Sequence, residues 1–419
     1  MRRASLGGAG WRLATLACLM VMVAGCSGEA GDGAPFTGET GGIGAEGPDG
    51  NGGNSGAAGG VGGIGANGSG GGGSSGAAGG VGGVADGTGG TSGGPNEPPS
   101  GTIPMFVAQG HAGRTIISCD DGRTWVADQS DEAWDYCSSN DCDHGPGAGR
   151  GITWGDGWFF ATFGWGGSGT VKRSRNGVTW EPVLESGDFG GVAFGNGRLV
   201  AASRSGQYSD DHGETWNDFE STELSGWTVR ATGFAPYGGG RFIISADGEI
   251  VVSADGSTWS KPQSIPAACS GGAYQGRIIY GNGTIVMTPA SGPVCYSTDG
   301  GQTWSSTSDV GPLRANGIWN GSEFMAWNFG TVYRSADGRH WTSTETVPND
   351  IDFGVAAVSD QGTIVGISNG WQQHYDSQVF YRSEDGVNWE VLSAAAYTGG
   401  HPIKVIAFGY GEPSAQCPL

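Results

Sequence analysis

One short pattern recurs seven times in this chain and constrains its fold more than any other feature. It reads Ser-x-Asp-x-Gly-x-Thr-Trp or a near copy, and its closing tryptophans lie 36 to 55 residues apart. This period is typical of one four-stranded propeller blade. Seven copies therefore predict an all-β fold, a seven-bladed propeller of four-stranded blades. The third and last positions of the copies are Asp120 and Trp125, Asn176 and Trp180, Asp211 and Trp216, Asp255 and Trp259, Asp299 and Trp304, Asp337 and Trp341, and Asp385 and Trp389.

The residue types of the pattern suit a tight turn followed by a packing anchor. Ser and Asp side chains hydrogen-bond the backbone of a turn, and Gly permits a sharp reversal. Trp supplies a large apolar ring to the space between sheets. One full repeat after Gly190 predicts strands over residues 192–194, 198–203 and 207–209, with a hairpin turn at Asn196-Gly197. A fourth, outer strand is expected after Trp216.

The repeated pattern resembles the Asp-box, or BNR repeat, of sialidases, photosystem II assembly factors and other propellers. The resemblance extends over about residues 103–410, and in those families the box lies on the outer rim, away from the ligand. It therefore implies a structural role for the box aspartates; calcium binding or catalysis there is the alternative.

The two ends of the repeat region predict how the ring closes. Residues 103–109 (IPMFVAQ) match a second strand, so blade one lacks an inner strand of its own. Lys404–Gly411 (KVIAFGYG) matches Gly190–Gly197 (GGVAFGNG) nearly position for position. We expect the C-terminal strand to complete blade one, which removes the exposed sheet edges.

The first 100 residues predict an address and a tether rather than a fold. Arginines precede an apolar run at residues 13–24, which is short for a membrane span, and Val23-Ala24-Gly25-Cys26 follows. This resembles the lipobox of bacterial lipoproteins, in which the cysteine is lipidated, and Ser27 after it implies the outer membrane. An ordinary secretory signal is the alternative. We expect a signal peptide over 1–25, a lipid on Cys26 and an exported, cell-surface protein.

Residues 26–100 are rich in Gly and Ser and nearly free of aromatic and branched apolar residues, so they predict a disordered tether. The propeller then occupies residues 101–419. The net charge of −21 argues against nonspecific nucleic-acid binding, and we expect a monomer that meets the membrane only through its lipid.

Six cysteines follow Cys26, and an even number in an exported domain predicts disulfides. Fifteen pairings are possible. We favour Cys137–Cys142 within a loop and Cys269–Cys295 within a blade, which leaves Cys119–Cys417 to join the two ends. The spacings do not suit zinc, and we expect neither a metal nor a cofactor.

By analogy with other propellers, ligands meet the face at which the inner strands begin. Several cations stand near this level in a strongly acidic chain, and gathered near one axis they would bind an anionic ligand. The alternative is that each pairs with a nearby acid or caps a strand end. The cations are Arg150, Arg314, Lys404, Arg230 and Arg277.

Loops on the same face carry aromatic and acidic residues that suit sugar stacking or protein contact. Packing of the loops themselves is the alternative, and a faint Asp141-x-Asp143-x-Gly145 calcium pattern is better explained by a disulfide-bound turn. The residues are Trp165, Trp371, His374 and Tyr375, with Asp135 and Asp143 in the Val126–Gly149 insertion.

The resemblance to sialidases implies an Arg-Ile-Pro start and six blades, whereas this chain has Thr102-Ile103-Pro104 and seven boxes. Asp135 and Asp143 are the only candidates, and weak ones, for another glycosidase with two carboxylates. We therefore favour a non-catalytic, surface-tethered binding module for a glycan, peptide or protein. A glycoside hydrolase and an assembly or scaffold factor are the alternatives.

Overall fold

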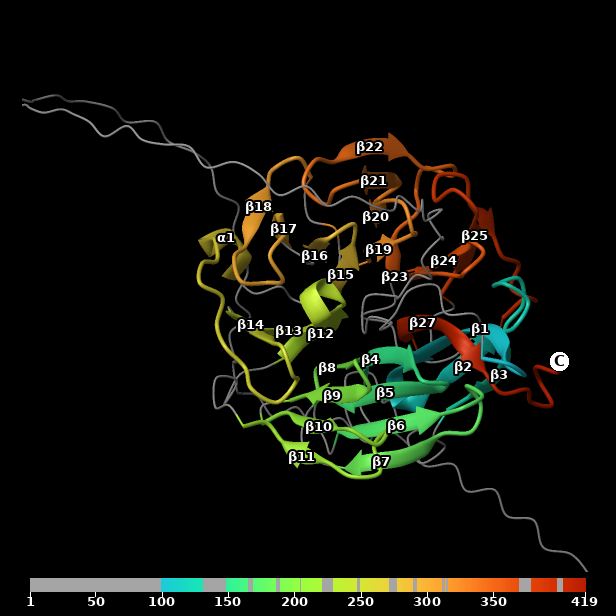
Figure 1. Ribbon diagram of the computed structural model, residues 1–419. Helices are drawn as coiled ribbons and strands as arrows, with labels where there is room; N and C mark the ends of the chain where they lie inside the picture. Colours follow the sequence, from blue (N-terminus) through green and yellow to red (C-terminus); the bar gives the residue numbers. More distant parts are fainter. Residues whose placement is uncertain are drawn as a thin grey trace, which may run out of the picture. The chain divides into compact units, whose positions relative to one another are not determined.

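Seven antiparallel sheets follow one another around a ring (Figure 1). The structure, a computed structural model, describes residues 99–130, 148–164, 169–185, 189–203, 205–220, 229–246, 249–270, 277–288, 292–310, 313, 316–368, 378–397 and 402–419. The predicted signal peptide, Cys26 and almost all of the predicted tether lie outside these residues. They remain expectations from the sequence.

Each sheet is one blade, and its strands run outward from the ring axis. Blades one to three comprise β27 (Ile403–Gly411), β1 (Ile103–Gly110), β2 (Thr115–Ser118) and β3 (Val126–Gln129); β4 (Ala148–Gly155), β5 (Trp158–Gly164), β6 (Thr170–Ser174) and β7 (Glu181–Glu185); and β8 (Gly191–Gly195), β9 (Arg198–Ala202), β10 (Gln207–Ser209) and β11 (Asn217–Asp218).

Blades four to seven comprise β12 (Val229–Ala235), β13 (Arg241–Ala246) and β14 (Glu249–Ser253); β15 (Arg277–Gly281), β16 (Thr284–Thr288), β17 (Val294–Ser297) and β18 (Ser305–Thr307); β19 (Ile318–Trp319), β20 (Phe324–Asn328), β21 (Thr331–Ser335) and β22 (Thr342–Glu345); and β23 (Phe353–Val358), β24 (Ile364–Ser368), β25 (Phe380–Ser383) and β26 (Glu390–Val391). In blade four a single bridge between Val252 and Ser260 stands where the other blades have a fourth strand. The short helices are η1 (His111–Gly113), η3 (Tyr237–Gly239) and α1 (Ala267–Ser270). In the described part of the chain, no helix is long and apolar enough to cross a membrane.

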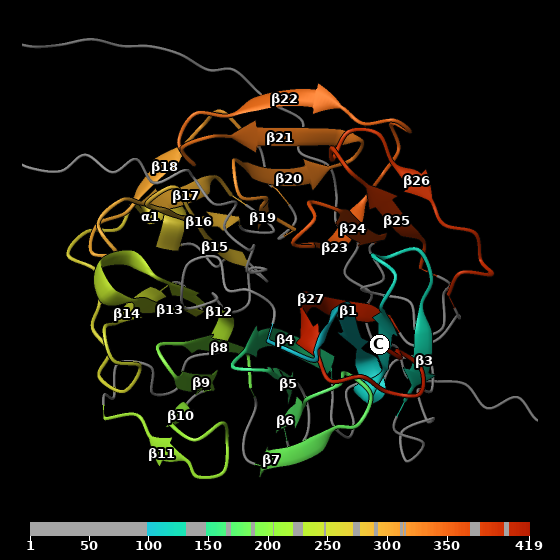
Figure 2. The same ribbon diagram turned by 45° about the vertical axis from the view of Figure 1, so that its right-hand side comes forward.

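The C-terminal strand closes the ring, as the sequence predicts. β27 pairs antiparallel with β1, with Ile103 opposite Gly411 and Phe106 opposite Phe408. The inner strands contact one another in the order β27, β4, β8, β12, β15, β19 and β23, and β23 returns to β27 (Figure 2). The order is cyclic, so neither end of the folded region leaves an unpaired inner edge.

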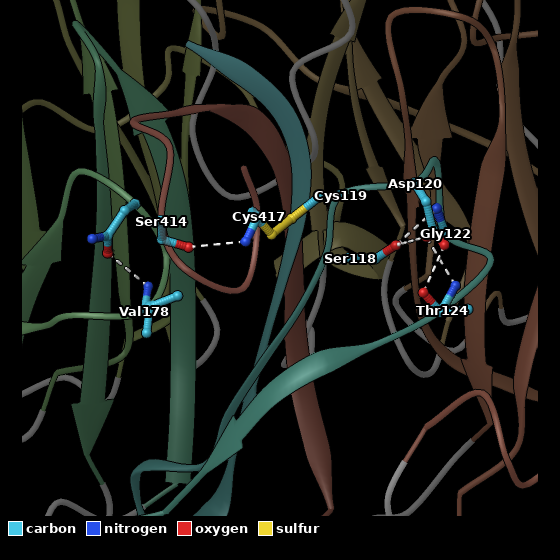
Figure 3. The surroundings of a disulfide bond; sticks show 9 residues. Ser118, Cys119, Asp120, Gly122, Thr124, Val178, Ser414 and Cys417 are labelled. Carbon is cyan, nitrogen blue, oxygen red and sulfur yellow. Dashed lines mark hydrogen bonds between the residues drawn. A yellow bond between two sulfur atoms is a disulfide. The ribbon is translucent and has the colours of Figure 1, made fainter. Parts of the chain in front are cut away.

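A disulfide fastens the same closure. Cys119, directly after β2, is bonded to Cys417 in the C-terminal segment (Figure 3). The second predicted disulfide, Cys269–Cys295, is also present. Both pairings are confirmed, and the third prediction, Cys137–Cys142, lies outside the described residues.

The predicted hairpin turns are present where the sequence has Asn-Gly or Asp-Gly. Asn196 and Gly197 have φ values of 52° and 76°, the double positive φ of a tight hairpin turn. In blade six the turn is built differently, because the Asn320 side-chain oxygen accepts hydrogen bonds from the amides of Ser322 and Glu323.

The boxes are hydrogen-bonded turns, as Figure 3 shows for blade one. The Ser118 hydroxyl donates to Asp120 Oδ1 at 2.9 Å and accepts from the Gly122 amide at 3.0 Å. The Thr124 amide and hydroxyl both donate to the Asp120 carboxylate. Trp125 then packs edge-on against Phe380 of blade seven, with ring centroids 4.9 Å apart. The box therefore links two blades, which is the structural role that the resemblance implies.

The Cys119–Cys417 disulfide predicts a larger stability effect than its counterpart within blade five. It joins residues 298 positions apart, against 26 for Cys269–Cys295, and a longer loop restricts the unfolded chain more. We expect Cys119→Ser with Cys417→Ser to lower the free energy of unfolding by about 2–5 kcal/mol. Urea unfolding measures this, with the Cys269→Ser, Cys295→Ser protein as the matched control; an equal or larger loss in the control would contradict it.

The boxes also predict acid sensitivity. Hydrogen bonds from the Thr215 hydroxyl and amide hold the pKa of Asp211 at about 2, below its ordinary 3.8. The unfolded chain therefore binds more protons below about pH 4, and stability falls as the pH drops towards 2. We expect Asp211→Asn to shrink this fall in thermal melts between pH 5 and 2. Asp218→Asn, at an exposed position outside the box, is the control and should keep the full fall.

Candidate functional site

The inner strand of blade one has an irregular register at its first turn of pairing. Val405 lies opposite Gln109 and Ile403 lies opposite Gly110, so Lys404 is an extra residue between the two pairs. Such a β-bulge leaves one residue out of the ladder and re-aims its side chain. Lys404 thus leaves the alternation that would place it on one side of the sheet.

Blade two repeats this device. Gly149 lies opposite Phe163 and Gly151 lies opposite Thr162, which leaves Arg150 as the extra residue of β4. The start of β4 lies close to blade one, because a Cβ on Gly149 would stand 3.3 Å from the carbonyl oxygen of Gly110. The two bulges therefore lie at the junction of neighbouring blades, on the face where the inner strands begin. We call this the top face.

The same irregularity recurs in blades four and seven. In β12 the register shifts across Arg230, and in β23 it shifts across Gly354. Three of the four bulged residues are thus cations that the sequence nominates for ligand binding. The side chain of Arg230 lies outside the described set, so only its register position is known.

Lys404 and Arg150 influence each other electrostatically. Burial, with a further contribution from the positive charge of Arg150, lowers the pKa of Lys404 from 10.5 to about 7. Both side chains are partly buried. The structure therefore brings together two of the predicted cations, in an environment where a lysine is half-charged near neutral pH.

Arg277 serves a different purpose. Its side chain is 5% exposed, and its Nη1 donates to the Ala356 carbonyl of blade seven at 2.7 Å. This contact passes over blade six and fixes the spacing of inner strands β15 and β23. For Arg277 the alternative reading of the sequence, a structural partner for the cation, is the one that the geometry favours.

The remaining predicted site residues lie outside the described residues, and their predictions stand as made from the sequence. They are Arg314, Trp165, Trp371, His374, Tyr375, Asp135 and Asp143.

The box aspartates are poor candidates for acid catalysis. Asp255 and Asp385 are partly desolvated, which opposes ionisation, but hydrogen bonds from their turns outweigh this and hold each pKa at about 2. A general acid needs a pKa near the working pH. Within the described ranges, no group of three or more His, Cys, Asp or Glu side chains is placed to hold a metal ion.

The sequence analysis missed a cavity that adjoins the bulges. It has a volume of about 260 Å³ and lies between blades one and two. Gln109 and Thr115, which pair with each other across β1 and β2, belong to its lining, and so does Lys172 of β6. Polar residues inside otherwise apolar strands were the available signal, but only the stacking of the two blades brings them together.

No family model and no curated protein matches the chain. Solved structures match at low identity. The GH74 xyloglucanase from Xanthomonas campestris is 15% identical, with a TM-score of 0.48 over 74% of this chain and 55% of that one. YCF48 from Cyanidioschyzon merolae is 14% identical, with a TM-score of 0.42 over 63% and 95%. A structure of YCF48 bound to D1 peptide is 12% identical, with a TM-score of 0.39 over 77% and 96%.

The chain spans about half the length of the xyloglucanase that it matches. At these identities the likeness concerns the propeller fold alone. The function of this chain has to be argued from its own residues.

Lys404 predicts an unusual pH dependence of stability. Folded Lys404 loses its proton near pH 7, whereas unfolded lysine keeps it up to 10.5, so the unfolded state binds more protons between these values. The free energy of unfolding should therefore gain a rising contribution from Lys404 as the pH is raised from 7 towards 10.5. Urea unfolding between pH 6.5 and 9.5 measures it, and Lys404→Met should lack it. Lys261→Met, at a lysine side chain 46% exposed, is the control; the same profile in wild type and Lys404→Met would contradict the prediction.

Proposed function

We propose that this protein is a non-catalytic, surface-tethered binding module that holds a carboxylate-bearing ligand on its top face, at the junction of blades one and two. The observation that supports this most strongly is the pair of bulged cations, Arg150 and Lys404. A β-bulge is a feature that re-aims side chains beside functional sites. Two of them set like charges close together at one point of the ring.

The charge balance of the chain makes this pair distinctive. With a net charge of −21, the protein repels anions at long range, so an anionic ligand needs a local attraction. Arginine offers a planar fork that matches a carboxylate, and lysine adds a second positive charge. A bound carboxylate would also relieve the repulsion that holds the pKa of Lys404 down.

A binding role also fits the rest of the chain as the sequence presents it. In this proposal the lipid on Cys26 anchors the protein to the outer membrane, and the Gly-rich segment up to residue 100 gives the propeller reach. The partner is a glycan, peptide or protein that displays the carboxylate at the cell surface. Neither step requires chemistry at the ligand.

Binding can be tested directly on arrays that display uronic-acid and sialic-acid glycans, neutral glycans and acidic peptides. We expect carboxylate-bearing ligands to be retained, with affinity at least about tenfold lower in Arg150→Gln and in Lys404→Gln. Affinity should also fall between pH 6 and 8, as Lys404 loses its proton. Lys261→Gln, far from the pair in sequence, serves as the control.

Two results would contradict the proposal. One is binding of neutral ligands alone, or of acidic ligands with unchanged affinity in both variants. The other is turnover of fluorogenic glycosides that Asp135→Asn or Asp143→Asn abolishes, which would favour the hydrolase.

A further inference from the structure

The cavity between blades one and two has a buried floor and an exposed mouth. Gln109 and Phe163 are each 1% exposed and Thr115 is 2% exposed, so they form the floor. Gln129 and Ser130, at the outer edge of blade one, are exposed and lie at the mouth. The walls come from the turn after η1 and from blade two: Gly113, Lys172, Val178 and Trp180.

The floor contains a polar atom that lacks a partner. The Gln109 side-chain amide donates from Nε2 to the Thr115 hydroxyl at 3.1 Å, but its Oε1 accepts no hydrogen bond from the described residues. The Thr115 hydroxyl donates weakly to the Gly113 carbonyl, 3.4 Å away, and so does not serve Oε1. Folded proteins satisfy nearly all buried polar atoms, and an exception calls for an explanation.

Blade two supplies complementary groups. The Lys172 ammonium lies 5.4 Å from the centre of the Phe163 ring, so it stands over the floor of the cavity. Trp180 is only partly buried, whereas five of the other box tryptophans, in blades one and four to seven, are 3–7% exposed. Its indole N–H donates to the Gly177 carbonyl at 2.9 Å, which fixes the ring against the turn. The cavity thus combines an acceptor, a cationic donor and a held aromatic ring.

We infer that this cavity binds one neutral sugar ring. Trp180 packs against the apolar face of the ring, one sugar hydroxyl donates to Gln109 Oε1, and another accepts from Lys172. A hydroxyl can do both because it has one proton and two lone pairs. The inference concerns a site separate from the bulged cations and does not rest on the proposed function.

The lining argues against other small ligands. A carboxylate only accepts hydrogen bonds, so it would leave Gln109 Oε1 unpaired. An ammonium ligand would be repelled by Lys172. The volume of about 260 Å³ is below the range of about 300–1,000 Å³ that is typical for drug-sized ligands, which suits a single ring. The residues found to line the cavity include no Asp or Glu, so it is equipped to bind a sugar but not to hydrolyse one.

The test uses the full chain and four probes: the methyl β-pyranosides of glucose, galactose, mannose and xylose. Saturation-transfer NMR detects binding, and calorimetric titration gives the Kd. We expect at least one pyranoside to bind saturably, and Lys172→Gln and Gln109→Leu each to raise its Kd about fivefold to tenfold. Lys261→Gln is the matched control for Lys172→Gln, and Arg150→Gln should leave pyranoside binding unchanged.

Each possible result bears on the inference. Failure of all four pyranosides to bind, or an unchanged Kd in Lys172→Gln, overturns it. Binding of acetate or N-methylacetamide in competition at this cavity, with no pyranoside bound, also overturns it. Loss of pyranoside binding in Arg150→Gln but not in Lys172→Gln moves the sugar to the bulged cations and overturns it as well. Lys172 is partly exposed, so this variant keeps the test valid if Gln109→Leu does not fold.

Discussion

The antiparallel pairing of β27 with β1 is the interaction on which the rest of the structure depends. It joins residues about 300 positions apart, Ile103 with Gly411, and makes the first and last parts of the repeat region one blade. Without it, β1 and β23 would each leave a sheet edge or a blade face open to solvent. The Cys119–Cys417 disulfide and the packing of Trp125 against Phe380 of blade seven hold the same closure from two further sides.

Closure also determines where the candidate site lies. Lys404 reaches the top face only because the C-terminal strand enters blade one, and its bulge lies next to Gly110, against which the start of β4 packs. Arg150 arrives from the other side of that contact. The cation pair and the cavity both lie at the seam where the two ends of the chain meet. In a repeat fold whose other seams are built from consecutive blades, this one alone joins the C-terminal strand to the sequence that follows the tether.

Much of the fold was predictable from the sequence because the repeat carries local information. The box residues Ser, Asp, Gly and Trp specify a turn and an anchor wherever they occur, and the match of Lys404–Gly411 to Gly190–Gly197 specifies the closing strand. The pairing of Cys269 with Cys295 followed from their place in one blade. These inferences required only periodicity and turn chemistry.

The candidate site was predictable only in part. The alignment of repeats placed Arg150 and Lys404 at one level, but a register shift of one residue leaves no mark in the sequence, so the bulges were not foreseen. The same level included Arg277, which the structure commits to the Ala356 carbonyl instead. The cavity depends on how blade one stacks on blade two, and Gln109 read as an ordinary strand residue until its neighbours were known.

The central claim is that Arg150 and Lys404 act together on a bound carboxylate. The chain has three lysines, Lys172, Lys261 and Lys404, so selective ¹³C labelling gives three resolvable signals in an NMR pH titration. The account predicts that one signal, absent in Lys404→Met, titrates near pH 7 and moves to a higher pKa when a uronic acid ligand is added. Titration of Lys404 near the ordinary 10.5, or a midpoint that a bound uronic acid does not move, would contradict it.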